Sequence, residues 1–92
     1  MVYEWSARKA LTNARKHGIS FEEAATVFLD PNAWTFADPD HSEDESREIT
    51  IGHTRNQKLI FVSHCDREGR TRIISARIAT KRERKIYEKS ID

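Results

Sequence analysis

Residues 71–87 read TRIISARIATKRERKIY, and they decide how the C-terminal part of the chain folds. The portion from Arg72 to Arg77 predicts a buried strand. Thr80 and Glu83 form a capping box, which predicts a basic helix that continues through Tyr87. Positive charge is therefore expected where a strand ends and a helix begins, and a phosphate group could be held there.

Two further strands are expected just upstream. Residues 47–53 and 58–65 have the usual strand length, and short polar links of hairpin size join them to each other and to the strand that ends at Arg77. Residues 59–62 are all apolar, so we expect their strand at the centre of an antiparallel sheet. The alternation in Trp34-Thr35-Phe36 adds a further strand, which gives a sheet of about four strands.

The N-terminal part predicts a short edge strand and two helices. The alternation at residues 2–5 suits the strand. The first helix should span residues 7–16 and be closed by Gly18. A capping box at residues 20–23 starts the second, which should stop at Asp30-Pro31. The predicted order is β, α, α, β, β, β, β, α, which is that of an α+β domain.

The composition bounds the class of protein. The chain has 92 residues, 37% hydrophobic and 34% charged, which suits a single domain over residues 1–92. Cys65 is the single cysteine, so no disulfide can form within the chain. No signal-peptide pattern is present, and no apolar run approaches the ~20 residues that span a bilayer. We therefore expect a cytoplasmic protein that does not enter a membrane.

The charge is strongly polarised along the chain although its net value is only +1. Residues 21–48 hold nine acidic side chains and one basic one, whereas residues 67–89 hold nine basic and three acidic ones. Such asymmetry favours a polyanion on one surface and a basic partner on another. The alternative is that the two segments neutralise each other across the fold.

Several short sequence words, taken in order, resemble one family. Each word alone is weak, but together they run from about Tyr3 to Glu88. They resemble the BrnT toxin family, a branch of the small RelE-like ribonuclease toxins. The words are Trp5, Lys9, Asn13, Lys16-His17-Gly18-Ile19, Phe21-Glu22-Glu23-Ala24, Asp38-Pro39-Asp40-His41-Ser42, Ile51-Gly52, Ile74-Ser75-Ala76-Arg77, Glu83-Arg84 and Tyr87.

The resemblance implies a RelE-like α+β fold and a type II toxin. Such a toxin is a metal-independent endoribonuclease that inhibits translation. The implied partners are RNA and a BrnA-type antitoxin with a ribbon-helix-helix part, and promoter DNA is bound only through the toxin–antitoxin complex. The acidic segment 38–48 would meet the antitoxin or shield the basic site. The competing interpretation is a degenerate toxin, a non-catalytic module that binds RNA or a protein through the same polarised surface.

Metal-free RNA cleavage needs a base for the 2′-hydroxyl, cations around the phosphate and an acid for the leaving oxygen. Arg77 is the first catalytic candidate, because arginine offers a planar fork to two phosphate oxygens. The alternative is a salt bridge to Glu83 or Glu45. Arg47 would join Arg77 on the same phosphate if the strand registers allow it, and would otherwise be a solvated strand start. Glu45 is also a candidate base, with a solvated loop acid as the alternative.

The four histidines are candidates for proton transfer, because histidine titrates near neutral pH. His53 shares a strand face with Arg47 and is the catalytic candidate among them, with a capped strand end as the alternative. His64 alternates with apolar residues, which predicts a core histidine. His17 lies at a helix end, and His41 lies in the acidic loop.

Further RNA contacts are expected from basic residues and one aromatic residue. Lys81 and Arg82 lie in the first turn of the last helix, whose free N–H groups also favour an anion. An ordinary solvated helix face is the alternative for them, and packing on the sheet is the alternative for Tyr87. Neither a metal nor a cofactor is expected, because the histidines and Cys65 lack metal-binding spacing. The residues expected to bind RNA are Lys81, Arg82, Arg72, Lys16 and Tyr87.

Overall fold

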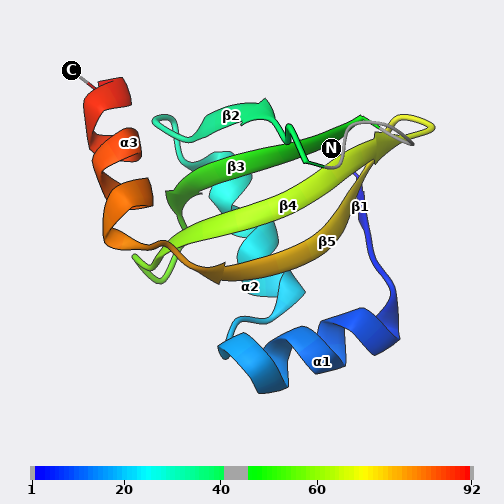
Figure 1. The fold of residues 1–92 in the computed structure, drawn as a ribbon. Helices are drawn as coiled ribbons and strands as arrows, with labels where there is room; N and C mark the ends of the chain where they lie inside the picture. The colour runs from blue at the N-terminus through cyan, green and yellow to red at the C-terminus, as the bar shows by residue number, and fades with distance from the viewer. Residues whose placement is uncertain (1, 41–45, 92) are drawn as a thin grey trace.

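In the computed structural model, which describes residues 2–40 and 46–91, two helices come before most of a sheet and one follows it (Figure 1). This arrangement confirms the predicted α+β class. None of the helices in the described ranges is both long and apolar enough to cross a membrane. The elements are β1 (Tyr3–Glu4), α1 (Ala7–His17), α2 (Phe21–Ala25), the 3-10 turn η1 (Thr26–Leu29), β2 (Trp34–Ala37), β3 (Arg47–His53), β4 (Leu59–Arg67), β5 (Arg70–Ile78) and α3 (Lys81–Ile91).

The strands form one sheet in the order β1-β5-β4-β3-β2. Strands β2 to β5 are antiparallel neighbours, and the apolar strand β4 lies at the centre, as its composition predicted. β1 is an edge strand, also as predicted, but it pairs with β5 in parallel and only through Tyr3 with Thr71 and Glu4 with Arg72. The rest of that edge of β5 faces α1, whose Asn13 binds it at Ala76.

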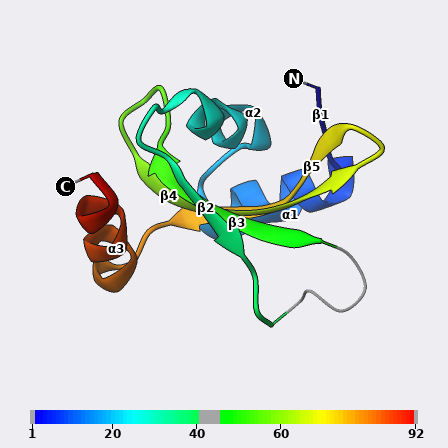
Figure 2. The same ribbon diagram turned by 90° about the horizontal axis from the view of Figure 1, so that it is seen from above.

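The helices are divided unequally between the two sides of the sheet (Figure 2). α1, α2 and η1 pack on one side, where each fully buried large apolar side chain stabilises the fold by about 1.5–3 kcal/mol. α3 packs on the other side at one end, where Tyr87 joins a second, smaller apolar cluster. Much of the second face is therefore not covered by a helix. The larger cluster contains Ile19, Phe21, Ala24, Val27, Ile60, Val62, Ile73 and Ala76.

The second predicted helix is not one regular helix. It begins where predicted, since Ser20 Oγ accepts a hydrogen bond from the Glu23 N–H at 3.0 Å. The α-helical winding then ends at Ala25 and tightens into η1. Thr26 explains the change, because its hydroxyl donates to Glu23 O at 2.6 Å and accepts from the Arg55 N–H at 2.9 Å. Such side-chain bonds to the backbone compete with regular helix, and here they tie the turn to the loop after β3.

Candidate functional site

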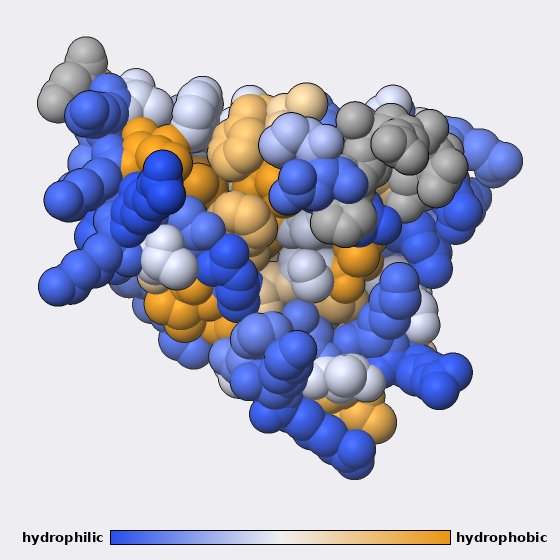
Figure 3. All heavy atoms as spheres, viewed as in Figure 1, coloured by the Kyte–Doolittle hydropathy of each residue, from blue (hydrophilic) through white to orange (hydrophobic). Residues whose placement is uncertain are grey.

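The side of the sheet opposite α1 and α2 carries a groove of about 350 Å³, which we call the sheet-face groove. Figure 3 views this side and shows an apolar strip of the sheet framed by hydrophilic side chains. An open sheet with aromatic rings and nearby cations suits a single-stranded nucleic acid. The described residues that line the groove are Phe36, Asp38, Pro39, Asp40, Arg47, Ile49, Phe61, Ser63, Ile74 and Ser75.

Arg77 lies against Phe61, one of the residues that line this groove, and is held in a fixed orientation. Its guanidinium carbon lies 4.1 Å from the centre of the Phe61 ring, a cation–π arrangement. Nη1 and Nη2 each donate to one carboxylate oxygen of Glu83 at 2.8 Å. These bonds raise the pKa of Arg77. Burial alone would raise the pKa of Glu83, but the bonds from Arg77 and Thr80 lower it below its usual value. The predicted alternative for Arg77, a salt bridge to Glu83, is thus present in the structure.

The ion pair with Glu83 leaves some of the N–H donors of the Arg77 guanidinium available. Nη1 also donates to Ile78 O at 3.3 Å, so three of the five guanidinium N–H donors are used. The other two, on Nε and Nη2, lie on the same side of the planar group and have no partner among the described residues. The side chain is 35% exposed. Arg77 can therefore bind one oxyanion through two parallel bonds while Glu83 holds its plane.

Glu83 combines the two roles that the sequence offered for it, helix cap and partner of Arg77. Its Oε1 accepts from the Thr80 N–H at 2.9 Å, and Thr80 Oγ1 accepts from the Glu83 N–H at 3.2 Å, which completes the capping box. The same carboxylate binds Arg77. The beginning of α3 and the guanidinium of Arg77 are therefore fixed to each other, and Lys81 and Arg82 are exposed in the same helical turn.

The strand registers do not bring Arg47 and Arg77 onto one phosphate. Arg47 pairs with Cys65, whereas Arg77 pairs with Phe61, whose other partner is Ile51. The four residues from Arg47 to Ile51 extend roughly 13 Å along the strand. Arg47 therefore lies toward the opposite end of the sheet-face groove from Phe61, beside which Arg77 is held, and the registers do not support the expectation of a shared phosphate.

Arg72 is also not placed in the groove. Its Nη1 donates to Glu4 Oε2 at 2.8 Å, which ties β5 to the edge strand β1. No local pattern indicates this pair, because Glu4 and Arg72 are brought together only by the parallel pairing of β1 with β5. A role for Arg72 in RNA binding has no support from this arrangement.

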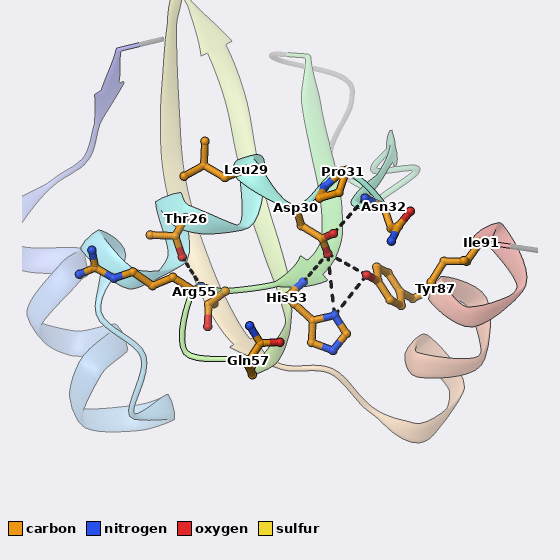
Figure 4. A pocket seen from close by; sticks show the side chains of 11 residues that line it. Thr26, Leu29, Asp30, Pro31, Asn32, His53, Arg55, Gln57, Tyr87 and Ile91 are labelled. Atoms are coloured by element: carbon orange, nitrogen blue, oxygen red, sulfur yellow. Dashed lines mark hydrogen bonds and ion pairs between the residues drawn. The ribbon is translucent and has the colours of Figure 1, made fainter.

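A second site, which we call the end pocket, lies where β3 ends, between η1 and α3 (Figure 4). Its volume is about 500 Å³. Asp30, His53 and Tyr87 point toward one another in it. Asp30 Oδ2 accepts from the Tyr87 hydroxyl at 2.8 Å and from the backbone N–H of His53 at 2.8 Å. The His53 Nδ1 atom lies 3.1 Å from the Tyr87 oxygen.

These contacts decide how the histidine can act. Because the Tyr87 hydroxyl donates to Asp30, its oxygen accepts from His53 Nδ1. This assignment, which rests on the hydrogen-bond network, leaves the lone pair on Nε2, and that atom points away from both partners (Figure 4). The His53 side chain is 34% exposed. His53 is therefore held in place at one nitrogen and open to a substrate at the other, as a general base requires.

The electrostatics of the end pocket favour a charged Asp30 and a neutral Tyr87. Burial raises the pKa of Asp30, but N–H donors from His53 and Asn32 and the Tyr87 hydroxyl outweigh it and lower that pKa. Burial, together with the Asp30 carboxylate, raises the pKa of Tyr87 to about 12. Tyr87 consequently acts as a hydrogen-bond donor near neutral pH, not as an anion.

Gly52 makes the contact between Asp30 and the end of β3 possible. A Cβ at this position would lie 2.8 Å from Val27 Cγ2 and 3.1 Å from Asp30 Oδ2. The close approach of η1 to β3 therefore requires glycine here. Sequence reasoning missed Asp30, which was interpreted only as part of a helix stop. The signal that could have found it was Gly52, since a glycine inside a strand indicates a close backbone approach.

The remaining predicted residues are distributed as follows. His64 is a core histidine, as predicted: its Nε2 lies 2.7 Å from Thr50 Oγ1, and burial lowers its pKa to about 4. Glu45 and His41 lie outside the described residues, so the role of Glu45 as a base remains a prediction. Lys16 lines a third groove beside α1. Within residues 2–40 and 46–91, no group of three or more His, Cys, Asp and Glu side chains is arranged to hold a metal ion.

The two sites are connected through α3. Glu83, which holds Arg77, and Tyr87, which contacts His53, are four residues apart and so lie on the same face of the helix, about one turn from each other. Of the four predicted catalytic residues, Arg47 and Arg77 belong to the sheet-face groove and His53 to the end pocket. The structure also brings the predicted RNA contact Tyr87 to His53.

Comparison with known proteins identifies a matching family and a similar solved structure. Residues 5–83 match the family model described as ribonuclease toxin, BrnT, of a type II toxin–antitoxin system. Among solved structures, the fold is similar to the 1.1 Å crystal structure of the Brucella abortus ribonuclease toxin BrnT, with a TM-score of 0.69 and 24% sequence identity, covering 88% of this chain and 100% of that chain. None of the curated proteins compared with the chain matches it. At this identity the structural match establishes a shared fold.

Proposed function

Because the chain belongs to the BrnT family of ribonuclease toxins of type II toxin–antitoxin systems, we propose that it is an endoribonuclease that cleaves RNA without a metal ion and thereby inhibits translation. Family membership implies an RNA substrate and an antitoxin partner. The ribonuclease assignment rests on the family match. The geometry adds which side chains would carry the reaction.

One observation supports the proposal above the others: Arg77 keeps two parallel N–H donors available beside an open groove. Charge builds up on the phosphate oxygens as RNA is cleaved, and preorganised donors stabilise that charge most when they need not move. Glu83 and Phe61 hold the guanidinium in one orientation before substrate arrives. Arg47, at the other end of the groove, would then contact a neighbouring phosphate and not the same one.

Proton transfer is assigned to His53. In the proposed step the 2′-hydroxyl oxygen attacks the adjacent phosphorus and the bond to the 5′-oxygen breaks, which leaves a 2′,3′-cyclic phosphate and a 5′-hydroxyl. His53 Nε2 would take the proton of the 2′-hydroxyl, and the leaving 5′-oxygen would gain a proton from water or a second acid. This role requires the scissile phosphate to lie on the α3 side of Arg77, where the helix brings the end pocket near.

The antitoxin is proposed to be of the BrnA type, with a ribbon-helix-helix part through which the complex would reach promoter DNA. The acidic segment supports a role in neutralisation, since Asp38 and Asp40 line the same groove as Arg47. Charge reversal of the exposed Asp40 should weaken antitoxin binding in a titration of the purified partners. An unchanged dissociation constant would refute this role of the segment.

Incubation of the purified full-length chain with RNA in EDTA tests the ribonuclease proposal directly. We expect cleavage that persists in EDTA, yields cyclic phosphate ends and fails when a 2′-deoxynucleotide replaces the nucleotide 5′ of the cleaved bond. Arg77→Ala should abolish most of it. Arg15→Ala, which removes an exposed arginine on α1, is the matched control and should leave cleavage unchanged. Binding without cleavage would instead indicate the non-catalytic module.

A further inference from the structure

A third groove lies between α1 and β5, and we call it the α1 groove. Its volume is about 530 Å³. α1 contains Arg8, Lys9, Arg15 and Lys16 and no acidic residue. Three of these four cations border the groove, and no acidic side chain is among its described lining residues. Those residues are Ser6, Arg8, Lys9, Thr12, Asn13, Lys16, His17, Ile74 and Ser75.

Asn13 fixes the α1 groove in place. Its side-chain amide donates to Ala76 O at 2.8 Å and to Ile19 O at 3.0 Å, and its oxygen accepts from the Ala76 N–H at 3.0 Å. Asn13 therefore pairs with β5 as a strand residue would, at an edge that the short β1 does not reach. Lys9 and Lys16 are four residues before and three residues after Asn13, so all three share one helix face. The packing that buries Asn13 thus brings both lysines to β5.

The α1 groove adjoins the sheet-face groove. Both are lined by Ile74 and Ser75. The register of β4 with β5 passes from Ser63–Ser75 to His64–Ile73, so Ile74 is an extra residue that forms a β-bulge. A bulge bends its strand and redirects a side chain. One extended chain can therefore pass from the sheet face across this bulge to the lysines of α1.

We propose that the α1 groove is a second RNA subsite, in which Lys9 and Lys16 bind the phosphates of nucleotides that flank those in the sheet-face groove. The proposal rests on the proposed ribonuclease function and extends its substrate contact. Two features favour single-stranded RNA as the occupant: the cations meet no acidic side chain among the described lining residues, and the groove adjoins the one proposed to hold the substrate. The flexible side chain of lysine can bind a phosphate group without selecting the nucleotide's base.

The experiment measures how RNA affinity depends on length, in a form that does not require cleavage. Oligoribonucleotides of about 4 to about 12 nucleotides carry 2′-O-methyl groups, which remove the attacking hydroxyl, and a fluorophore for anisotropy. Wild-type protein should bind the longer oligonucleotides about tenfold more tightly than the shortest. The double variant Lys9→Ala/Lys16→Ala should lose this increase with length. Its salt dependence with the longest RNA should also fall, by about 1.4 in the slope of log K against log salt for two phosphates.

Arg15→Ala is the control, because Arg15 is exposed on the same helix, next to Lys16, but does not line the groove. It should keep the increase with length. A double variant that behaves like Arg15→Ala would overturn the subsite. A loss of antitoxin affinity with unchanged RNA affinity would overturn it as well and make the groove a protein-binding surface. Absence of cleavage by the wild type is a separate outcome, which contradicts the ribonuclease proposal and leaves this binding measurement interpretable.

Discussion

The sheet-face groove and the end pocket contain different halves of the chemistry that RNA cleavage needs. The groove has fixed positive charge, with Arg77 held over Phe61 by Glu83. The end pocket has a hydrogen-bonded set for proton transfer, Asp30 with His53 and Tyr87. Neither region contains the other's groups among the described residues. α3 contributes Glu83 to one region and Tyr87 to the other, so it is the element that must align them on one substrate.

The largest effect should come from Arg77→Ala. Removing the preorganised cation should lower kcat by about 1,000-fold, and Arg77→Lys should recover only part of this, because lysine lacks a planar fork. Single-turnover cleavage assays in EDTA measure the change. A loss no larger than that of Arg15→Ala would remove the sheet-face groove from catalysis.

His53→Gln should reduce kcat by about 100-fold. The side chain of glutamine is polar but cannot take up a proton, so the dependence of kcat on pH should also flatten. Arg77→Ala, in contrast, should keep the shape of the wild-type profile at a lower rate. If His53→Gln keeps that shape, proton transfer lies outside the end pocket, and Glu45 becomes the base to test.

Acid should destabilise the fold through His64 and so limit the pH range in which the two regions can be compared. Its pKa is about 4 in the folded protein, below the ordinary value of 6.5, so below that ordinary value the unfolded chain binds a proton that the folded chain does not. The free energy of unfolding should therefore fall by about 2 kcal/mol between about pH 7 and about pH 5. Urea titrations measure this slope. His64→Gln should reduce it, and an equal slope in the variant would contradict the assignment.

Asp30→Asn should lower kcat by about tenfold with little change in KM. The amide can still accept the backbone N–H of His53 but loses the charge that stabilises a protonated imidazole beside it. The pH profile should shift in this variant, which a purely structural role of Asp30 would not cause. An unchanged profile with a lower melting temperature would assign Asp30 to stability alone.

Phe61→Leu should give the smallest effect. Leucine keeps an apolar side chain beneath Arg77 but removes the aromatic face, and the lost cation–π contact corresponds to about a threefold decrease in kcat. Because Glu83 still holds the guanidinium, the decrease should be far smaller than that of Arg77→Ala. A decrease as large as that of Arg77→Ala would mean that Phe61 contacts the substrate itself.

Local patterns predicted most of the fold. Residues 47–53 form a strand with the bounds that the sequence indicated, the apolar strand β4 lies at the centre, and Thr80 with Glu83 caps α3. Each of these depends on residues close in sequence, where side-chain periodicity and capping act directly. The prediction of one continuous second helix failed because the hydroxyl of Thr26 binds the backbone of Arg55, a partner that sequence periodicity does not reveal.

The candidate sites were predicted as single residues but not as groups. Arg77 and His53 are both placed where chemistry is possible. The strand registers do not support the expected partnership of Arg77 with Arg47, and the partners Asp30 and Tyr87 of His53 were not foreseen. Strand register and the pairing of the edge strand determine which side chains from different strands become neighbours. A periodic sequence pattern predicts neither of them. Arg72 shows the same limit, since its ion pair with Glu4 depends on β1.

Local sequence patterns were sufficient to predict the order of the elements, the central strand, the helix caps and the basic segment that includes α3. Three contacts became visible only in the three-dimensional fold: Gly52 lets η1 bring Asp30 to His53, Glu83 leaves two of the five Arg77 N–H donors available, and Asn13 docks the lysines of α1 beside β5. The physical reason is distance along the chain. Propensity and capping act within a few residues, whereas these contacts join segments whose approach is fixed by strand register and close packing.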